Sequence, residues 1–383
     1  MPNPDVEPAT ARASPAIPGT VGSSPSPPAL PGPPLGAAPG QVQIWFDTAL
    51  QAALPVQDGS LGAERDAARA YAQLGKAENT RRAYVAAVRI WCAWCERRGL
   101  CPLPGSGPDV AAFLASERGR GIAPKTLILR RAGIRYLHRV AGCPVPTDDA
   151  CVAETLAGIQ RTAIREGQHP RKKKAATVQV LRRLLAPMDD DLPALRDRAL
   201  LLVGFAGALR RSELVGIRLA DLEHTERGLR LRLAQTKGSQ TEAVTVPLPY
   251  GDTELCPVRA LDRWIAAAGI TDGAVFRRIW RPKAGADQRP GVQQPPPLPR
   301  LGADALTARA LALIVQARAV AAGFARLELG GHSLKRGALT TGMDRGVHPT
   351  QLKRLGRHKS YEVLGEYLEF GDLFEGHPLG GVL

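Results

Sequence analysis

One stretch, residues 195–209, limits what this chain can fold into more than any other. It is apolar almost all the way round a helix, and its longest unbroken run has eleven residues, Ala199 to Leu209, between Arg198 and Arg210. Eleven residues are too few to cross a bilayer, which takes roughly 20. A helix without a polar face is buried on all sides, so we expect several helices packed around this one.

The composition divides the 383-residue chain into a Pro-rich tail and a folded part. Residues 1–40 hold twelve of the 33 prolines, and such a stretch buries too little apolar surface to offset the entropy of ordering. We expect disorder there, followed by an optional short helix over residues 43–54. The remainder is long enough for two domains. The predicted divisions are a tail over residues 1–60, a helical domain over 61–168, a basic linker over 169–176 and a second domain over 177–383.

The formal net charge of +15 indicates a polyanionic partner. Residues 1–60 hold one basic and four acidic side chains, so the basic excess belongs to the folded part. Lys and Arg side chains gain affinity for nucleic acids by releasing condensed counterions. The alternative is the general arginine richness of a GC-rich genome, without a polyanionic partner.

The six cysteines are scattered, and no signal peptide precedes them, which favours reduced thiols in the cytoplasm. Cys92 and Cys95 form the one close pair, in WCAWC, and no second pair of ligands follows at a spacing typical of zinc sites. We interpret both as packing residues. The expectation is a cytoplasmic, nucleoid-associated protein without a membrane partner.

Apolar residues at helical spacing predict four helices in the first domain. They are expected to start at a cap at Asn79 or Thr80, at residue 108, at residue 124 and near residue 147. The third, over residues 124–139, carries basic residues opposite an apolar face. We interpret them as contacts to a polyanion; a solvated face without a ligand is the alternative. These residues are Lys125, Arg130, Arg131, Arg135 and Arg139.

The linker over residues 169–176 combines a helix-breaking proline with four consecutive cations, and Thr177 follows as a candidate N-cap. We expect it to lie along the polyanion, with contacts from Arg171, Lys172 and Lys173. Further on, residues 229–233 and 243–248 alternate with period two and predict a β-hairpin with Lys237 near its turn. Residues 281–304 are too rich in Pro and Gly for regular structure.

The C-terminal part gathers His332, Lys335, Arg336, His358 and Tyr367 within a short span. Imidazoles, fixed cations and a phenol suit chemistry at a phosphodiester, where oxyanion charge is neutralised and a nucleophile is supplied. The two histidines lack the acidic or thiol neighbours of a metal site, and we predict no metal ligand. Phosphoryl transfer onto a tyrosine is the hypothesis, with Tyr361 as the rival nucleophile.

These residues resemble the active-site pattern of the tyrosine recombinases, also called the phage-integrase family. That pattern has an arginine in a G-L-R-x-S-E-L run, a lysine in a β-hairpin, H-x-x-R, a second His or Trp, and a tyrosine nine residues later. The run GALRRSELVGIRLADL supplies Arg210, and TKGSQT supplies Lys237. His332, His358 and Tyr367 match the later elements, and the resemblance covers roughly residues 79–383.

The resemblance implies a mainly α fold with a small β-hairpin or sheet, in which a helical, SAM-like core-binding domain precedes the catalytic domain. It implies a site-specific recombinase that cuts and rejoins double-stranded DNA through a 3′-phosphotyrosyl intermediate, without metal or other cofactor. The protein would act as a homotetramer on paired DNA sites. Free in solution it would be a monomer or a weak oligomer. Arg210, His332 and His358 would stabilise the phosphate and Lys237 would protonate the leaving oxygen, with Glu213 as an orienting partner.

One position departs from the family pattern. Lys335 stands where the family has its second arginine, which keeps the charge but loses the planar fork that holds two phosphate oxygens. Arg336, the next residue, is the alternative phosphate ligand or a contact to the DNA backbone. Two other functions therefore stay open: a DNA-binding protein of the same fold with weakened or lost strand exchange, and a type IB topoisomerase with the same chemistry.

Overall fold

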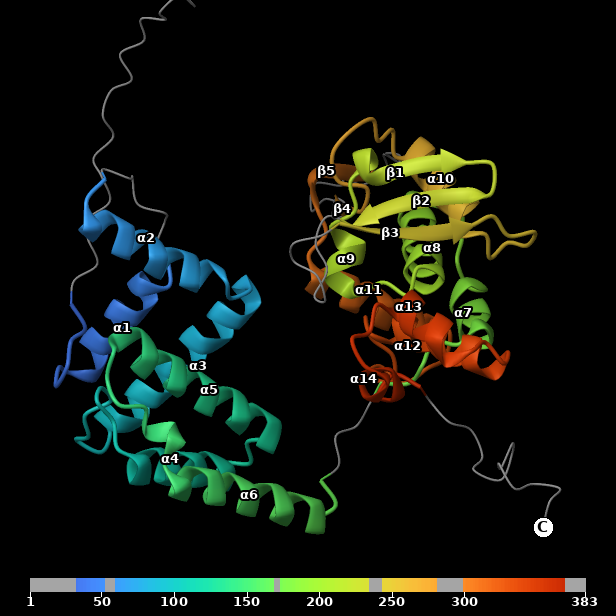
Figure 1. The fold of residues 1–383 in the computed structure, drawn as a ribbon. Helices are drawn as coiled ribbons and strands as arrows, with labels where there is room; N and C mark the ends of the chain where they lie inside the picture. The colour runs from blue at the N-terminus through green and yellow to red at the C-terminus, as the bar shows by residue number, and fades with distance from the viewer. Residues whose placement is uncertain (1–31, 52–58, 169–172, 234–242, 281–298, 369–383) are drawn as a thin grey trace, which may run out of the picture. The chain divides into compact units, whose positions relative to one another are not determined.

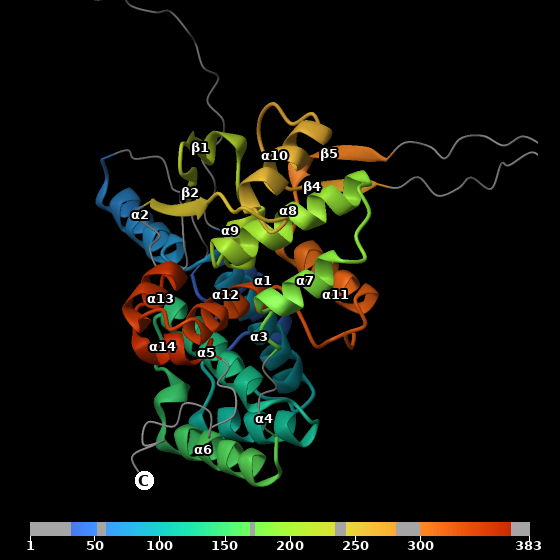
Figure 2. The same cartoon turned by 90° about the vertical axis from the view of Figure 1, so that its right-hand side faces the viewer.

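The computed structural model describes residues 32–51, 59–168, 173–233, 243–280 and 299–368, and the chain forms two compact units that divide after Pro170. Figure 1 and Figure 2 show that both units are built mainly from helices, with small antiparallel sheets in the second. The predicted fold class is confirmed. Within the described residues, no helix is long and apolar enough to span a membrane.

Six α-helices build the described part of the first unit. They are α1 (Pro39–Ala49), α2 (Leu61–Leu74), α3 (Glu78–Glu96), α4 (Gly107–Gly119), α5 (Pro124–Ala141) and α6 (Ala150–Arg165). The four predicted helices correspond to α3 to α6. The last starts later than expected because Pro146–Asp148 forms a separate 3₁₀ turn, after which Asp149 caps α6 by accepting a hydrogen bond from the Cys151 backbone at 3.0 Å.

Aromatic rings fill the core of the first unit. Trp91 and Trp94 stack with ring centroids 5.5 Å apart, and Phe113 meets both rings edge-on. Cys92 and Cys95 are buried beside them, so the prediction that they are packing residues is confirmed. Burial raises the pKa of the Cys92 thiol to about 12, which keeps it protonated at neutral pH.

Helix α1 belongs to this core, so the prediction of a tail through residue 60 is wrong. Phe46 is fully buried, Trp45 is 8% exposed, and the Phe46 ring meets Tyr136 of α5 at 6.3 Å. Large apolar side chains replace the prolines after Pro39, and their burial offsets the entropy of ordering the helix. Residues 1–31 lie outside the described part.

Helices also dominate the second unit. They are α7 (Val178–Leu185), α8 (Leu192–Ala206), α9 (Arg211–Val215), α10 (Pro257–Ala267), α11 (Ala308–Ala321), α12 (Ser333–Asp344), α13 (Pro349–Gly356) and α14 (Tyr361–Gly365). Helix α8 is the predicted buried helix and packs against α10 and α12. Gly204 lets α9 and α12 approach α8 closely: a Cβ there would lie 2.8 Å from Leu214 and 2.9 Å from Leu334.

The three-stranded sheet has the order β1 (Leu222–Thr225), β2 (Gly228–Leu233), β3 (Val244–Pro249), and both pairings are antiparallel. Leu229 pairs with Leu248 and Leu231 with Val246, which turns their side chains into the core. The predicted hairpin is confirmed as β2 and β3; its turn, with Lys237, lies outside the described residues. In Figure 1 this sheet lies at one end of the second unit and α12 to α14 at the other.

Two further predictions need correction. A second sheet pairs β4 (Arg277–Trp280) with β5 (Arg300–Ala305), so the end of the Pro-rich stretch over 281–304 does form regular structure. Residues 173–176 are not a free linker, because the Ala176 backbone donates to Ser333 O at 2.9 Å and Ala175 and Ala176 are buried. Gly337 permits this close approach, since any Cβ there would collide with the Ala176 carbonyl.

Candidate active site

Arg210 is fixed by the turn that joins α8 to α9. The turn passes through Ala208, whose φ of 43° is in the left-handed region, and Arg210 is the N-cap of α9. Glu213 holds the arginine twice: its Oε2 accepts from the Arg210 backbone at 2.8 Å, and its Oε1 accepts from Arg210 Nη1 at 2.7 Å. The carboxylate therefore orients the guanidinium, the role predicted for it.

Arg357 was absent from the predicted site, although it directly precedes His358 in the sequence. Its backbone is left-handed, with φ 52°, at the end of α13. Its guanidinium donates to Gly207 O at 3.1 Å, Ala208 O at 2.8 Å and Glu213 Oε2 at 2.9 Å. Arg210 Nη2 in turn donates to Arg357 O at 3.3 Å. These bonds join the segment that carries His358 to the turn that carries Arg210.

The two arginines decide the charge of Glu213. Burial alone raises the pKa of this carboxyl group, but the charge of Arg357 and the hydrogen bonds from Arg210 outweigh burial, and the pKa lies below its usual value. Glu213 is therefore ionised at neutral pH. A carboxylate that is ionised and already hydrogen-bonded to two arginines is an orienting partner and not an acid catalyst.

Lys335 projects from α12 into the same place and is fully buried. Its Nζ donates to Ala208 O at 3.2 Å and to Gly356 O. It also lies 5.8 Å from the centroid of the Tyr367 ring. Burial, together with the charges of Arg210 and Arg357, lowers the pKa of Lys335 to about 6.

Tyr367 and His358 are in direct contact. Their ring centroids are 4.6 Å apart, at an interplanar angle of 78°. His358 is 7% exposed, and burial, reinforced by the nearby Lys335, lowers the pKa of its imidazole to about 4. Tyr367 is half-buried and follows α14. A neutral imidazole thus packs against the phenol at pH 7.

The rival nucleophile, Tyr361, lies away from this cluster. Its side chain is exposed, its hydroxyl is 2.9 Å from Thr350 Oγ1, and Lys353 Nζ lies over its ring at 4.7 Å. His332 is exposed and is the N-cap residue of α12, one turn before Lys335. Lys237 lies outside the described residues.

Arg336 points elsewhere than Lys335. It is 6% exposed, and its guanidinium donates to the backbone carbonyls of Lys173 and Tyr367, the latter from Nε at 3.4 Å. These contacts tie α12 to the start of the second unit and to the tyrosine segment. Of the two neighbouring cations, Lys335 is the one that lies among the ionisable side chains of the cluster.

The basic face expected on α5 is smaller than predicted. Arg130 is 9% exposed and forms a buried ion pair with Glu117, so its placement on an exposed face is wrong. Arg131 donates to Thr147 O at 3.0 Å, and Arg135 pairs with Asp148 at 2.8 Å. The exposed members are Lys125 and Arg139. Arg171 and Lys172 lie outside the described residues, and Lys173 Nζ donates to Leu327 O.

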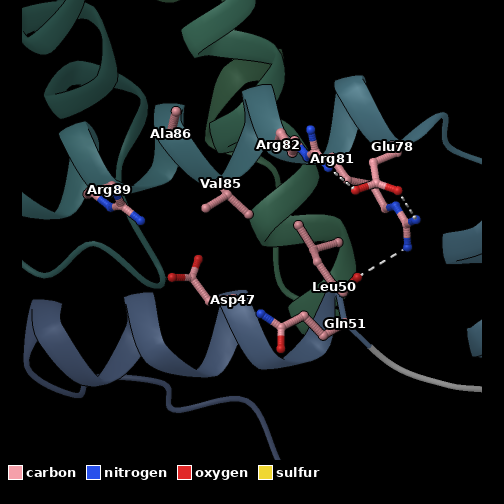
Figure 3. A pocket seen from close by; sticks show the side chains of 9 residues that line it. All are labelled: Asp47, Leu50, Gln51, Glu78, Arg81, Arg82, Val85, Ala86 and Arg89. Atoms are coloured by element: carbon pink, nitrogen blue, oxygen red, sulfur yellow. Dashed lines mark hydrogen bonds and ion pairs between the residues drawn. The ribbon is translucent and has the colours of Figure 1, made fainter. Parts of the chain in front are cut away.

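A separate hollow of about 600 Å³ lies between α1 and α3 (Figure 3). Arg81, Arg82 and Arg89 line it together with Asp47 and Glu78. Figure 3 shows the Arg81 guanidinium reaching the Leu50 carbonyl, at 3.3 Å, and Glu78 reaching the neighbouring arginines. Three cations facing two carboxylates leave little net charge, so the hollow does not resemble a polyanion site.

A mainly helical unit that places a tyrosine against a histidine and a lysine, with a clamped arginine near that lysine, defines the class of the tyrosine recombinases. Residues 174–371 match the model of the phage integrase family, and the chain belongs to this family. It is a site-specific tyrosine recombinase.

Relatives cover most of the chain. It is 31% identical over 310 residues to the integrase/recombinase XerD homolog of Selenomonas ruminantium, across 79% of this chain and 85% of that protein. It is 24% identical over 300 residues to recombinase Cre of Escherichia phage P1, across 76% and 84%. Among solved structures, the post-cleavage complex of the XerH site-specific recombinase with difH aligns with a TM-score of 0.59 at 13% identity, across 91% and 98%. The XerH likeness bears on the fold alone.

Proposed function

We propose that the chain cuts and rejoins double-stranded DNA with Tyr367 as the nucleophile, forming a 3′-phosphotyrosyl link while a 5′-hydroxyl leaves. The observation that carries this proposal is the position of the Tyr367 ring, 4.6 Å from the His358 ring and 5.8 Å from Lys335 Nζ. The net charge of +15 and the 31% identity to the integrase/recombinase XerD homolog of Selenomonas ruminantium also support it.

Each member of the cluster has a role in this reaction. Arg210, held by Glu213, would neutralise a phosphate oxygen, with hydrogen bonds from His332 and His358 to the other oxygens as charge develops. Lys335, and not Arg336, takes the place of the second family arginine, because Lys335 lies beside the Tyr367 ring and among Arg210, Glu213 and Arg357. Lys237 would protonate the leaving 5′ oxygen. The phosphotyrosyl link stores the bond energy, so rejoining needs no nucleotide.

The DNA contacts we propose come from both units. Lys125 and Arg139 are exposed on α5, Arg131 donates to a backbone carbonyl, and Arg135 is paired with Asp148. Arg171 and Lys172 would follow the DNA backbone in the linker. Buried Arg130 is left out. Four protomers would act on two paired sites of nucleoid DNA. Free in solution, the protein would be a monomer or a weak oligomer.

The test starts by finding a substrate. The protein would be mixed with DNA fragments from the genomic neighbourhood of its own gene, and the fragments that it retains would be identified. These would be rebuilt as duplexes with a nick close to the candidate cleavage point, so that the cut strand diffuses away. Wild type should form a protein–DNA adduct that survives detergent. Tyr367→Phe should abolish the adduct, while Tyr361→Phe should leave it. The reverse result would assign the nucleophile to Tyr361, and no adduct from any tyrosine would favour a DNA-binding protein without strand exchange.

A further inference from the structure

We infer that Lys335 accepts the proton of the Tyr367 phenol during strand cleavage, a catalytic role that an arginine in its place does not offer. The inference rests on the proposed function, which makes Tyr367 the nucleophile. Arginine stays protonated throughout the working pH range of proteins, whereas a buried lysine amine is a base. The departure from the family pattern then changes the chemistry of the site instead of only weakening it.

The hydrogen bonds of Lys335 match those of a neutral amine. An ammonium has three N–H donors and no lone pair, whereas an amine has two N–H donors and one lone pair. Nζ donates to two backbone carbonyls, Ala208 O at 3.2 Å and Gly356 O. The side chain is fully buried, so water does not reach it to accept a third N–H. Two acceptors satisfy the amine and leave its lone pair available.

The charges around Lys335 also favour a neutral amine. Arg210 and Glu213 face it from the start of α9, and Arg357 faces it from the end of α13. Glu213 is the carboxylate of this group, and both arginines already bond to it. An ammonium at Lys335 would be a third buried cation against one buried carboxylate, which low-dielectric surroundings oppose. These neighbours therefore favour the unprotonated form.

Two bases adjoin the Tyr367 ring, and Lys335 is the stronger one. The other is His358, from the segment after α13, whose ring contacts the phenol at 4.6 Å. Burial is the main cause that lowers the pKa of both groups, from 10.5 to about 6 for Lys335 and from 6.5 to about 4 for His358. Part of the lowering at His358 comes from a charged Lys335 and is lost when that amine is neutral. The group with the higher pKa takes the proton more readily, so the lysine is the better acceptor of the two.

The step balances without another reactant. The O–H bond of Tyr367 breaks and its proton goes directly to the Lys335 amine. The phenolic oxygen bonds to phosphorus, and the bond from phosphorus to the 5′ oxygen breaks, that oxygen taking a proton from the proposed general acid, Lys237. Lys335 becomes an ammonium as negative charge grows on the phosphate oxygens, so positive charge is created where and when it stabilises the transition state.

The test is the pH dependence of single-turnover cleavage of the nicked duplex, followed as detergent-resistant adduct between pH 5 and 8. The wild-type rate should fall about tenfold per pH unit once Lys335 is protonated, as expected for a single required base. Lys335→Arg should still cleave, yet its rate should change less than twofold over the acid part of this range. His332→Gln, which removes the exposed imidazole of the cluster, should keep the wild-type slope whatever its absolute rate.

The outcomes separate the two proposals. If Lys335→Arg keeps the acid slope, another group titrates and the inference is wrong while the proposed function stands. If His332→Gln removes the slope, the proton acceptor is His332. If neither wild type nor any variant forms an adduct at any pH, the proposed function fails, and the inference fails with it. Should Lys335→Arg fold poorly, Lys335→Gln at pH 8 serves instead: it has no base, and its cleavage should fall at least a hundredfold below wild type.

Discussion

Glu213 bonds two arginines that lie 147 residues apart in the chain. Its Oε1 accepts from Arg210 Nη1 at 2.7 Å, and its Oε2 accepts from Arg357 Nη2 at 2.9 Å. One carboxylate thus sets the distance between the turn that presents Arg210 and the segment that presents His358. These two hydrogen bonds hold the cluster in shape, and the carboxylate balances part of its positive charge.

Replacing Glu213 by Gln should destabilise the protein strongly. The amide keeps the shape but leaves Arg210 and Arg357 without a buried counter-charge, and breaking a buried pair costs about 3–5 kcal/mol. Urea unfolding measures the loss. The matched control is Glu223→Gln, which removes an exposed partner of Arg230 at 3.2 Å and should cost less than about 1 kcal/mol. Equal effects of the two changes would show that Glu213 is not the structural tie described here.

Arg357→Gly should impair cleavage without impairing DNA retention. Glycine accepts the left-handed backbone at this position, so the change isolates the lost bonds to Gly207 O, Ala208 O and Glu213. We expect adduct formation to slow by at least about tenfold, since misplaced catalytic groups are costly. Arg345→Ala removes an exposed cation at the end of α12 and is the control. Unchanged cleavage by Arg357→Gly would mean that His358 is positioned by other contacts.

The stability of the DNA-free protein should rise with pH through the action of Lys335. Its pKa is lowered from 10.5 to about 6 on folding, so between these values the unfolded chain binds more protons and each rise in pH favours the folded state. The upper limit for one proton is about 1.4 kcal/mol per pH unit. Lys335→Met removes this contribution, so its melting temperature, measured from pH 6.5 to 9, should rise less steeply than that of wild type. Parallel curves would indicate that the lysine is charged in the folded protein.

Neutralising Lys125 and Arg139 together should weaken DNA binding and flatten its salt dependence. Each lost phosphate contact reduces the slope of log K against log salt by about 0.9 for duplex DNA. The control is Arg82→Ala with Arg89→Ala, which removes the same charge from the hollow that already holds Asp47 and Glu78. Affinity measured at three salt concentrations distinguishes them. If the control pair reduced DNA affinity more, the DNA interface would be on α3 instead of α5.

Sequence alone was sufficient where a local pattern carries the information. An apolar run without a polar face identified the buried helix α8, period-two alternation identified β2 and β3, and helical spacing identified α3 to α6. The spacing between His358 and Tyr367 likewise pointed to the pair whose rings are in contact. Periodicity and short motifs are properties of neighbouring residues, and the chain expresses them before any distant contact forms.

Tertiary structure decided whatever depends on partners far along the chain. Arg130 and Arg131 look equivalent in sequence, but Glu117 draws Arg130 into a buried ion pair. Lys335 finds its carbonyl acceptors at Ala208, 127 residues away, and at Gly356, and Arg357 finds Ala208 across 149 residues. No local pattern encodes such pairings, because burial and the charges of distant side chains set both the geometry and the protonation state of these groups.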